Sequence, residues 1–411
     1  MPDDACVLPL VHSRIFTCRV EAPIPCRSVK SGRVASALAT LLDEAQRRQL
    51  RTCINFFGFM PPIFSSTTLT HTGRAAAPTV AVIIPFYNGS KWIERALASV
   101  AEQSIPANEI VVVNDGSRAD ERAALDGLVE KYAFRIIDKE NGGQGSARNA
   151  GVAAIRSDYI CFLDQDDFYL PDHIEVLVNA IPTGDRRFGF VYGDATEADG
   201  AGNVVRTAMI KAHNPTHPKR DVTDILRQDM FVLPSASLIH RPAFEKIGGF
   251  DPRLTGYEDD DLFLRMFRAG YTNYFIDRPV YVWCIHAEST SYSIRMSRSR
   301  FIYFTKLVDA FPDDAASSRR YFRDYIAPRF CRAFIADAFG AATSRSEYRS
   351  EISSNLKQFV SAVRANGSFS WAYRVRLSLI AFTLTQLPAR LVSTIGLIAR
   401  LPLLRRSVAR L

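Results

Sequence analysis

The chain has 411 residues, of which 47% are apolar, so it can bury the core of a catalytic domain of ordinary size and still carry further segments. Its seven cysteines include no C-x-x-C pair, which argues against a zinc ribbon and a disulfide framework and suits a reducing compartment. The net charge of +8 is distributed unevenly along the chain. Residues 79–291 carry 22 basic and 31 acidic side chains, whereas residues 292–411 carry 20 basic and 7 acidic side chains. The basic C-terminal part is therefore expected to face an anionic surface.

Residues 1–78 are expected to be a poorly structured extension that ends in a linker. The stretch "VASALATLLDEAQRRQLRTCI" predicts one helix over 34–54, and a segment rich in proline, serine and threonine follows it. The chain opens with "MPDDACVLPLVHSR", in which acids stand where a secretory signal peptide has basic residues, so no signal peptide is expected. We find no catalytic motif in this part of the sequence.

Strands and helices alternate between residues 79 and 167. Apolar, β-branched runs that end in polar residues predict buried parallel strands, and the segments between them have apolar residues at helical spacing. This alternation predicts a doubly wound α/β layer, in which ligands bind at the carboxyl ends of the strands. The predicted strands are "TVAVIIPFYN" (79–88), "EIVVVNDGS" (109–117), "FRIIDKE" (134–140) and "DYICFLDQDD" (158–167), and the predicted helices cover 90–103, 120–132 and 145–157.

The pattern becomes mixed after residue 190 and helical after 294. We therefore expect a single α/β catalytic domain over 79–291, with a mostly parallel central sheet, and a helical C-terminal region over 292–411 with a basic amphipathic end. Further strands are predicted at "FGFVYGDA" (188–195), "FVLPSASLIH" (231–240) and "NYFIDRPVYVWCIH" (273–286), and a turn with an acidic helix start is predicted within "GGFDPRLTGYEDDDLFLRMFRAGY" (248–271).

The predicted strand at 158–163 runs directly into three carboxylates, Asp164, Asp166 and Asp167. Like charges this close repel one another and are costly to bury without a positive partner. Asp164 and Asp166 are two residues apart, so at a strand end both point to one face and can reach one hard cation such as Mg²⁺ or Mn²⁺. The alternative is a solvated, aspartate-rich turn, but the buried strand and the neighbouring polar strand ends favour a metal site.

Two further strand ends carry candidate nucleotide contacts. Asp115 in "NDGS" (114–117) would by itself form an Asx-turn with Ser117, but beside a nucleotide its carboxylate can accept the imide N–H of uracil or thymine. The segment "NGGQGSARNAG" (141–151) is glycine-rich and enters a helix, although its spacing is not G-x-G-x-x-G. Its backbone N–H groups and Arg148 are suited to a diphosphate.

An acidic run and a histidine complete the set of candidate residues. Residues Glu258 to Asp261 stand at the predicted start of a helix, where the helix dipole stabilises acids, yet four in a row exceed what a helix start requires. An acid beside a metal-bound diphosphate can act as general base toward an acceptor hydroxyl. His286 ends the last predicted strand, where a histidine can complete a metal shell or contact phosphate, although a lone histidine is more often packed or on the surface.

Residues 80–291 resemble the inverting glycosyltransferases of family 2, which have the GT-A fold. The resemblance rests on five blocks in the family's order and spacing, and "IHAESTS" (285–291) looks like the family's closing segment. Each block is weak by itself, whereas the ordered set is specific. The five blocks are "VIIPFYN", "VVVNDGS", "NGGQGSARNAG", "CFLDQDD" and "GGFDPRLTGYEDDDLFLR".

The resemblance implies a role for each matched residue. Asp259, the second acid of the "ED" pair, matches the catalytic base. Asp166 of "DQD" matches the direct ligand of a Mn²⁺ or Mg²⁺ ion, Asp164 would lie nearer the ribose and the metal-bound waters, and His286 would complete the metal shell. Gln165 fills the variable position of that motif. The nucleotide pocket would be lined by Pro85, Tyr87, Asn88, Asp115, Arg148, Asn149 and Asp164.

The resemblance also implies a reaction, in which a sugar moves from a nucleoside-diphosphate sugar, a UDP- or dTDP-sugar, to a hydroxyl acceptor by one inverting displacement. The expected acceptor is a glycan or a lipid-linked glycan of a cell-surface polysaccharide, and the lack of a Q-x-x-R-W motif after Asp259 favours transfer of single sugars. Two alternatives belong to other classes. A catalytically silent sugar-nucleotide-binding or scaffold protein needs a broken set of acids, and a nucleotidyltransferase needs a G-x-G-x-R-rich loop, which "PFYNGSKW" does not supply.

The C-terminal end is apolar and basic. Residues 377–399 contain Arg390 as their only charge, but Pro388 and Arg390 stand in mid-stretch, where a membrane-spanning helix tolerates them poorly. A basic amphipathic helix on the membrane interface fits better than a span, and a helical cap packed on the catalytic domain is the alternative. Few aromatic residues are interleaved with the arginines, so nucleic acid is not expected as a partner. We expect a cytoplasmic protein that is peripheral on the inner face of the cell membrane.

Overall fold

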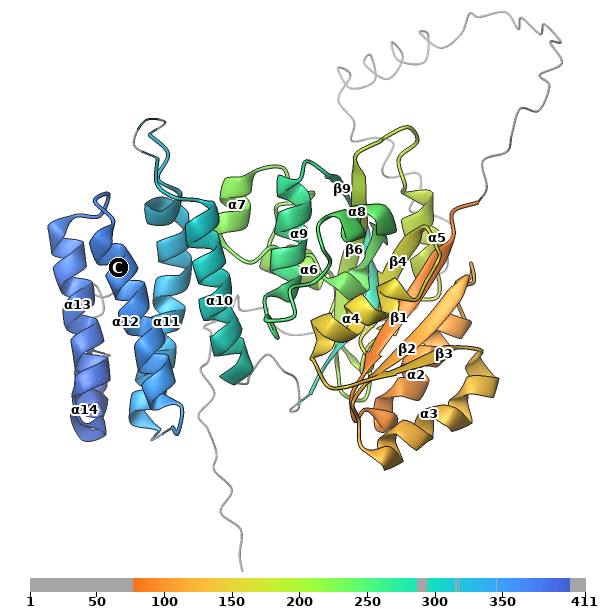
Figure 1. Ribbon diagram of the computed structural model, residues 1–411, viewed down its shortest axis with the longest axis horizontal. Coiled ribbons are helices and arrows are strands. Elements are labelled where there is room, and N and C mark those ends of the chain that lie inside the picture. The colour runs from red at the N-terminus through yellow and green to blue at the C-terminus, as the bar shows by residue number, and fades with distance from the viewer. Residues whose placement is uncertain (1–76, 287–293, 315, 317, 345, 400–411) are drawn as a thin grey trace, which may run out of the picture. The chain divides into compact units, whose positions relative to one another are not determined.

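The structure is a computed structural model that describes residues 77–286, 294–314, 316, 318–344 and 346–399. These residues belong to one compact unit, 75–411, whereas the helix expected over 34–54 lies outside the described residues. Figure 1 shows the unit as a sheet with helices packed on it and a group of C-terminal helices beside it.

Parallel strands form the first half of the sheet, in the order β3-β2-β1-β4. Every residue of β1 (Val80–Phe86) is buried, as expected for a β-branched run between two neighbouring strands. The predicted alternation of strands and helices is confirmed over this half. The other strands are β2 (Glu109–Asp115), β3 (Arg135–Lys139) and β4 (Tyr159–Phe162), and the crossover helices are α2 (Ser90–Ala101), α3 (Ala119–Tyr132) and α4 (Gln144–Ala153).

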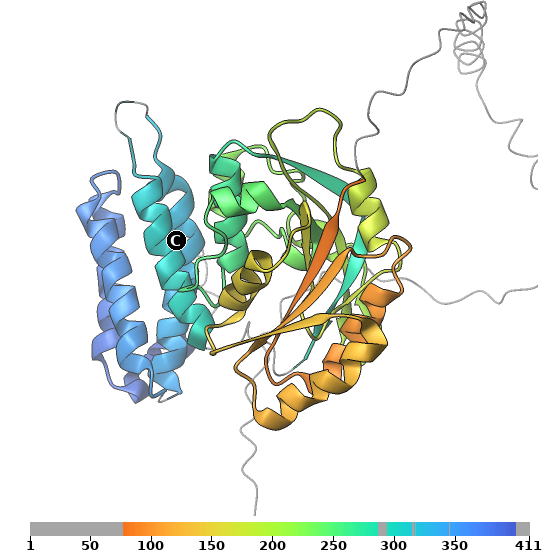
Figure 2. The same ribbon diagram turned by 45° about the vertical axis from the view of Figure 1, so that its right-hand side comes forward.

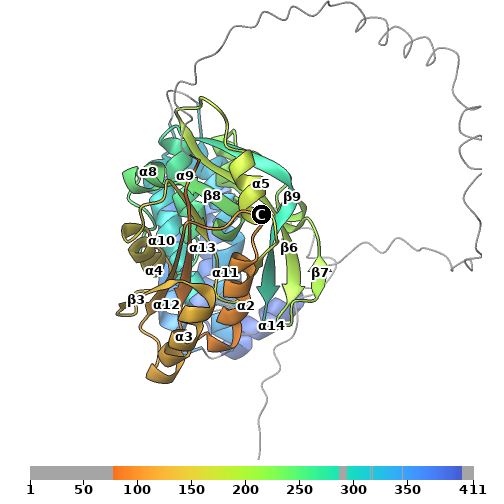
Figure 3. The same ribbon diagram turned by 90° about the vertical axis from the view of Figure 1, so that its right-hand side faces the viewer.

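The second half of the sheet mixes strand directions. β4 pairs antiparallel with β8 (Ser237–His240), β8 pairs antiparallel with β6 (Phe188–Asp199), and β6 runs parallel to β9 (Thr272–Ile285). β8 is shorter than predicted because Pro234–Ala236 forms a 3-10 turn, η2, ahead of it. Two short strands were not predicted: β5 (Phe168–Tyr169) pairs with β9, and β7 (Val204–Arg206) pairs with β6 at the margin seen in Figure 3.

Two hydrophobic cores lie on the two faces of the sheet. One joins the sheet to α4, α9 (Glu258–Arg268) and the C-terminal helices, and the other lies under α2, α5 (His173–Asn179) and α6 (Met209–His213). The first core requires a glycine in α4, since a Cβ at Gly151 would lie 2.4 Å from Cγ2 of Ile83 in β1. The last glycine of "NGGQGSARNAG" therefore permits close packing of the helix on the sheet.

The C-terminal region is helical, as expected, and its buried side chains continue the first core without a break. Figures 1 and 2 show α13 on the side of these helices that faces away from the sheet. No helix in the described part of the chain is both long and apolar enough to cross a membrane. The C-terminal helices are α10 (Ile294–Ala310), η4 (Phe322–Ile326), α11 (Ala327–Thr343), α12 (Arg349–Ala365), α13 (Trp371–Gln386) and α14 (Ala389–Ala399). The short helices α7 (Val222–Arg227) and α8 (Arg241–Lys246) lie earlier in the chain, before α9.

Candidate active site

A cavity of about 480 Å³ opens at the carboxyl ends of β1, β2 and β4. Polar strand ends meet there because parallel strands end at the same edge of a sheet. The end of β9 and the start of α10 also line the cavity, whereas Arg148, Asn149 and Asp259 lie outside its lining. The predicted site residues that line it are Pro85, Tyr87, Asn88, Asp115, Asp164, Asp166 and His286.

The first two acids of "DQDD" have separate partners. Oδ1 of Asp164 accepts hydrogen bonds from Nε2 of Gln144 and Nη2 of Arg148, both at 2.6 Å. Oδ2 of Asp166 lies 2.7 Å from Nε2 of His286, so the ends of β4 and β9 meet through this hydrogen bond. The two carboxylates, which stand two residues apart in the sequence, are therefore bound by groups from two different elements, α4 and the end of β9.

Asp167, the third acid, has a structural contact instead. It is buried and accepts a hydrogen bond from the backbone N–H of Cys284 in β9 at 2.8 Å. Burial, followed by the charges of Asp166 and Asp164, raises its pKa well above the ordinary range, and Arg95 of α2 opposes that shift. Arg95 also donates to the backbone carbonyl of Asp166 at 2.7 Å. Asp167 thus fastens the end of β4 to β9.

The ends of β4 and β9 fit a divalent cation. Burial, and then the charge of Asp164, raises the pKa of Asp166, as expected for a carboxylate that needs more positive charge nearby. Asp164, Asp166 and His286 offer oxygen and imidazole ligands to the same cavity. Within the described ranges, no group of three or more His, Cys, Asp or Glu side chains is arranged to hold a metal by itself. Proteins commonly hold Mg²⁺ or Mn²⁺ by one or two carboxylates together with substrate phosphates, and Asp164 and Asp166 would be those carboxylates here.

Arg148 connects the cavity to the start of α9. Its buried guanidinium donates from Nη2 to Asp164, and its Nη1 lies 3.6 Å from Oε1 of Glu258. Burial by itself lowers the pKa of an arginine, but the charges of Asp164 and Glu258 outweigh this effect and raise the pKa of Arg148. Arg148 is therefore a fixed cation between the strand-end acids and the helix that carries Asp259.

The four acids at the start of α9 have different partners. Three of them form ion pairs with cations from three other elements, and two of these cations belong to the C-terminal helices. Asp259 forms no ion pair with any of the residues that the structure describes. The acidic run is longer than a helix start requires because it also attaches α10 and α11. The pairs are Glu258–Arg148 at 3.6 Å, Asp260–Arg329 at 2.5 Å and Asp261–Lys306 at 2.5 Å.

Asp259 has the environment of a general base. It stands in the first turn of α9, its side chain is partly exposed, and its Oδ1 accepts the N–H of Asp260 at 2.8 Å. Burial, followed by the charge of Glu258, raises the pKa of Asp259 to about 7. A carboxylate with a pKa near the working pH is well suited to accept and release a proton.

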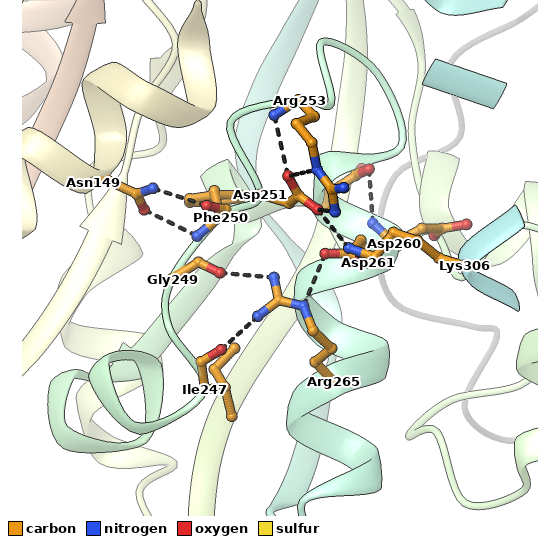
Figure 4. A network of polar contacts seen from close by, with 11 residues as sticks. Asn149, Ile247, Gly249, Phe250, Asp251, Arg253, Asp260, Asp261, Arg265 and Lys306 are labelled. Carbon is orange, nitrogen blue, oxygen red and sulfur yellow. Dashed lines mark hydrogen bonds and ion pairs between the residues drawn. The ribbon is translucent and has the colours of Figure 1, made fainter. Parts of the chain in front are cut away.

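Asn149, which was expected to line the nucleotide pocket, contacts the backbone of Phe250. Its Nδ2 donates to the carbonyl of Phe250 at 2.8 Å, and its Oδ1 accepts the N–H of Phe250 at 2.9 Å (Figure 4). Both ends of the amide are used, and the residue lies outside the lining of the cavity. Asn149 therefore holds the turn that precedes α9.

The same turn is fastened to α9 and α10 by charged groups, as Figure 4 shows. Arg265 of α9 donates to the carbonyls of Ile247 and Gly249 at 2.8 and 2.7 Å. Lys306 of α10 pairs with Asp251 at 2.8 Å. These contacts connect the block "GGFDPR" to the helix that carries Asp259, so the segment positions Asp259 and does not line the cavity.

Asp115 holds the glycine-rich loop at the end of β2. It accepts the N–H groups of Gly142 and Gly143 at 2.9 and 2.8 Å, and it pairs with Lys139 at 2.5 Å. Gly143 has a φ of +85°, a conformation that glycine adopts readily and other residues do not. A carboxylate offers about four acceptor positions. Asp115 therefore keeps the capacity to accept one N–H from a ligand in the cavity.

Gln165, the variable residue of "DQD", forms a contact that the sequence did not reveal. Its Oε1 accepts the N–H of Tyr87 at 2.9 Å, and its Nε2 donates to the carbonyl of Tyr87 at 3.2 Å. A Cβ at Gly89 would lie 2.3 Å from Cδ of Gln165, so the amide fits only against a glycine. Asn88 accepts the N–H of Arg118 at 3.0 Å. The loop after β1 is thus held to both neighbouring strand ends.

Arg295 of α10 is the site residue that sequence reasoning missed most clearly. It lines the cavity, and among the described lining residues it is the one Lys or Arg. No motif marks it, because it stands in a helical segment with several arginines. Trp92 of α2 also lines the cavity, and it stacks on His286 with ring centroids 4.4 Å apart.

Comparison with known protein families identifies the first part of the described unit. A family model described as glycosyl transferase family 2 matches residues 81–248. An uncharacterized glycosyltransferase of Rickettsia felis is 32% identical over 192 residues, which are 47% of this chain and 32% of that protein. An uncharacterized glycosyltransferase of Rickettsia prowazekii is 30% identical over 216 residues, which are 52% of this chain and 66% of that protein.

The chain is also similar to a named enzyme and to a protein of known structure. The chondroitin synthase of Escherichia coli is 30% identical over 218 residues, which are 52% of this chain and 30% of that protein. The chain thus spans about a third of the length of this relative and of the Rickettsia felis protein. The crystal structure of S. aureus TarS 1-349 in complex with UDP-GlcNAc aligns with a TM-score of 0.55 at 17% identity, over 75% of this chain and 90% of that chain. This similarity shows a shared fold.

Proposed function

The chain belongs to glycosyl transferase family 2 through residues 81–248, and from this premise we propose that it is a metal-dependent inverting glycosyltransferase that moves single sugars. The observation that carries the proposal is the pair of contacts of Arg148. One side of its guanidinium meets Asp164 in the cavity, and the other meets Glu258, the neighbour of Asp259 in the chain. A candidate cation site and a candidate proton acceptor thus lie on either side of one buried arginine.

The proposed donor is a nucleoside-diphosphate sugar. A cavity of about 480 Å³ is large enough for such a ligand, because small-molecule sites commonly measure about 300–1,000 Å³. Asp115 would accept an imide N–H of uracil or thymine, and Arg295 would face the diphosphate as the cation of the cavity. TarS, which shares the fold, has been solved in complex with UDP-GlcNAc, which supports this class of donor.

In the proposed mechanism, Asp259 in its ionised form accepts the proton of an acceptor hydroxyl. The hydroxyl oxygen attacks the anomeric carbon from the face opposite the departing diphosphate, so one displacement inverts the configuration. Asp164, Asp166 and His286 would hold Mn²⁺ or Mg²⁺, which when bound supplies Lewis-acid stabilisation of the leaving diphosphate. Arg148 keeps its charge at all working pH values and holds Asp164 and Glu258 in place.

The proposed acceptor is a hydroxyl of a glycan or a lipid-linked glycan. The relative named chondroitin synthase supports a glycan acceptor, but only by its name and over about a third of its own length. The acceptor and the sugar therefore have to be found by screening. Hydrolysis of the donor by water gives a readout that needs no acceptor, so it comes first.

The proposal is tested with a panel of nucleotide sugars, with Mn²⁺, Mg²⁺ or chelator, and with four forms of the protein. We expect Asp166→Ala to lose metal-dependent turnover and Asp259→Asn to bind the donor without turning it over. Asp120→Asn, which removes a highly exposed acid of α3, is the matched control and should behave as wild type. Undiminished transfer by Asp259→Asn would remove the base assignment. Donor binding without turnover by the wild type would favour a silent binding protein, and release of diphosphate from a nucleoside triphosphate and a sugar phosphate would favour a nucleotidyltransferase.

A further inference from the structure

The outer face of α13 is apolar and exposed. Trp371, Leu379 and Phe382 are 74%, 63% and 59% exposed. With Val375 they follow a spacing of four, four and three residues, which places them on one stripe of the helix. Leu391 of α14 is exposed as well, and we call Trp371, Val375, Leu379 and Phe382 the apolar face. Nine large apolar side chains are exposed in the described part of the chain, and four of them belong to this face.

The opposite face of α13 is already used by the fold. Leu377, Ala381 and Leu384 are buried in the first core, where α13 packs against α11 and α12. Tyr373 stacks on Phe369 with ring centroids 5.3 Å apart. Figures 1 and 2 show that no described helix covers the side of α13 that faces away from α12. A helix that is apolar on both faces usually has a second apolar partner.

The charge around the apolar face points to the chemistry of that partner. No Asp or Glu follows Glu351, whereas nine Lys and Arg residues do. At about 100° per residue, Arg374 and Arg376 fall on the two margins of the stripe. Arg390 is exposed beside Leu391. An apolar stripe with basic margins complements an anionic lipid surface, whereas a second copy of this chain would bring two basic segments together and repel.

We propose that the apolar face lies on the surface of a bilayer that contains anionic lipid. Trp371, Leu379 and Phe382 enter the boundary between headgroups and acyl chains, a position that suits tryptophan, and the arginines at the margins face lipid phosphates. The contact is interfacial and uses a side of α13 that the fold leaves open. It is independent of the proposed transfer reaction, since binding to vesicles requires neither donor nor acceptor.

The test is cosedimentation of the full-length chain with vesicles of phosphatidylcholine, with and without phosphatidylglycerol, at low and high salt. We expect binding to the anionic vesicles that weakens as salt screens the arginines. The triple variant Trp371→Ser/Leu379→Ser/Phe382→Ser should bind them on the order of 100-fold more weakly or worse, because three large apolar side chains no longer leave water. The matched control is Val204→Ser/Val205→Ser, which removes two exposed apolar side chains of β7 and should bind as wild type.

Two further measurements make the outcome decisive. Trp371 emission should shift to shorter wavelength with anionic vesicles, and Trp371→Phe should lose the shift while it keeps binding. The triple variant should unfold at the temperature of the wild type, because the replaced side chains face solvent. The proposal is overturned if the wild type does not bind, if it binds neutral vesicles equally well, or if the triple variant binds like the wild type. It is also overturned if gel filtration shows a dimer that the triple variant cannot form, since the face would then be covered by a second copy.

Discussion

Arg329 of α11 forms ion pairs with two carboxylates that differ in burial, and this difference gives a sharp prediction. Its Nη2 lies 2.5 Å from Asp260, and both side chains are 6% exposed. The same nitrogen lies 2.6 Å from Asp229, which is 50% exposed. Arg329→Met keeps most of the volume but removes the ion-pair partner of the buried carboxylate of Asp260. Removing one partner of a buried pair costs about 3–5 kcal/mol, so we expect the free energy of unfolding to fall by that amount.

The control uses the same arginine. Asp229→Asn removes the exposed partner and should lower the free energy of unfolding by about 0–1 kcal/mol, because water screens that pair. Adding Asp260→Asn to Arg329→Met should recover more than half of the loss, since the amide carries no charge and can still accept the N–H of Met230. The measurement is urea unfolding followed by far-UV circular dichroism at constant pH.

The reasoning is refuted if Arg329→Met costs no more than Asp229→Asn. It is also refuted if the double variant is less stable than Arg329→Met by itself. Either result would mean that the pair between α9 and α11 is hydrated and contributes little to attaching the C-terminal helices.

The remaining predictions concern the cavity and the packing of the sheet. Asp259 must be ionised to accept a proton, and its pKa is raised to about 7. We therefore expect kcat/KM to fall about tenfold per pH unit below pH 7 and to level off above it. A pH profile that is flat over this range would contradict the role of Asp259 as the base. Gly89→Ala places a Cβ 2.3 Å from the amide of Gln165, so it should raise the KM for the donor by about three- to tenfold through loss of one or two hydrogen bonds to the loop after β1. Gly127→Ala in α3, whose Cβ would meet nothing within 4 Å, is the control and should leave that KM unchanged. Gly151→Ala puts a Cβ 2.4 Å from a methyl group of β1 and should lower the free energy of unfolding by about 1–3 kcal/mol, measured by urea unfolding.

Local sequence patterns predicted the parallel half of the sheet, in which strands and helices alternate. The strands β1, β2 and β4 are short apolar runs, and segments with helical spacing connect the successive strands from β1 to β4, so their parallel order and their shared polar edge follow from period and connection rules. In the second half of the sheet, strands and helices do not alternate regularly. Its antiparallel pairs, β4 with β8 and β8 with β6, depend on which neighbouring strand each one packs beside in the folded protein. The two residues of β5 form a strand only because β9 lies beside them.

The candidate site divides in the same way. The acids at the end of β4 and Asp115 at the end of β2 were found because a buried strand that ends in carboxylates is a local signal. Arg295 was missed, and the contact of Asn149 with Phe250 was not foreseen, because their surroundings come from distant parts of the chain. The amide of Asn149 meets Phe250, which lies 101 residues further along.

The sequence by itself determined the chemical types that meet at the edge of the sheet and the family to which they belong, because strand period, turn residues and motif spacing are properties of neighbouring positions. Only the tertiary structure decided which acid joins two strands, which acids form ion pairs, and that Asp259 forms none with the described residues. Asp260 and Asp261 differ from Asp259 by their partners Arg329 and Lys306, which lie in helices far along the chain. The residue type shows that a side chain is acidic, but its pKa and its role depend on burial and on the cations that folding brings close to it.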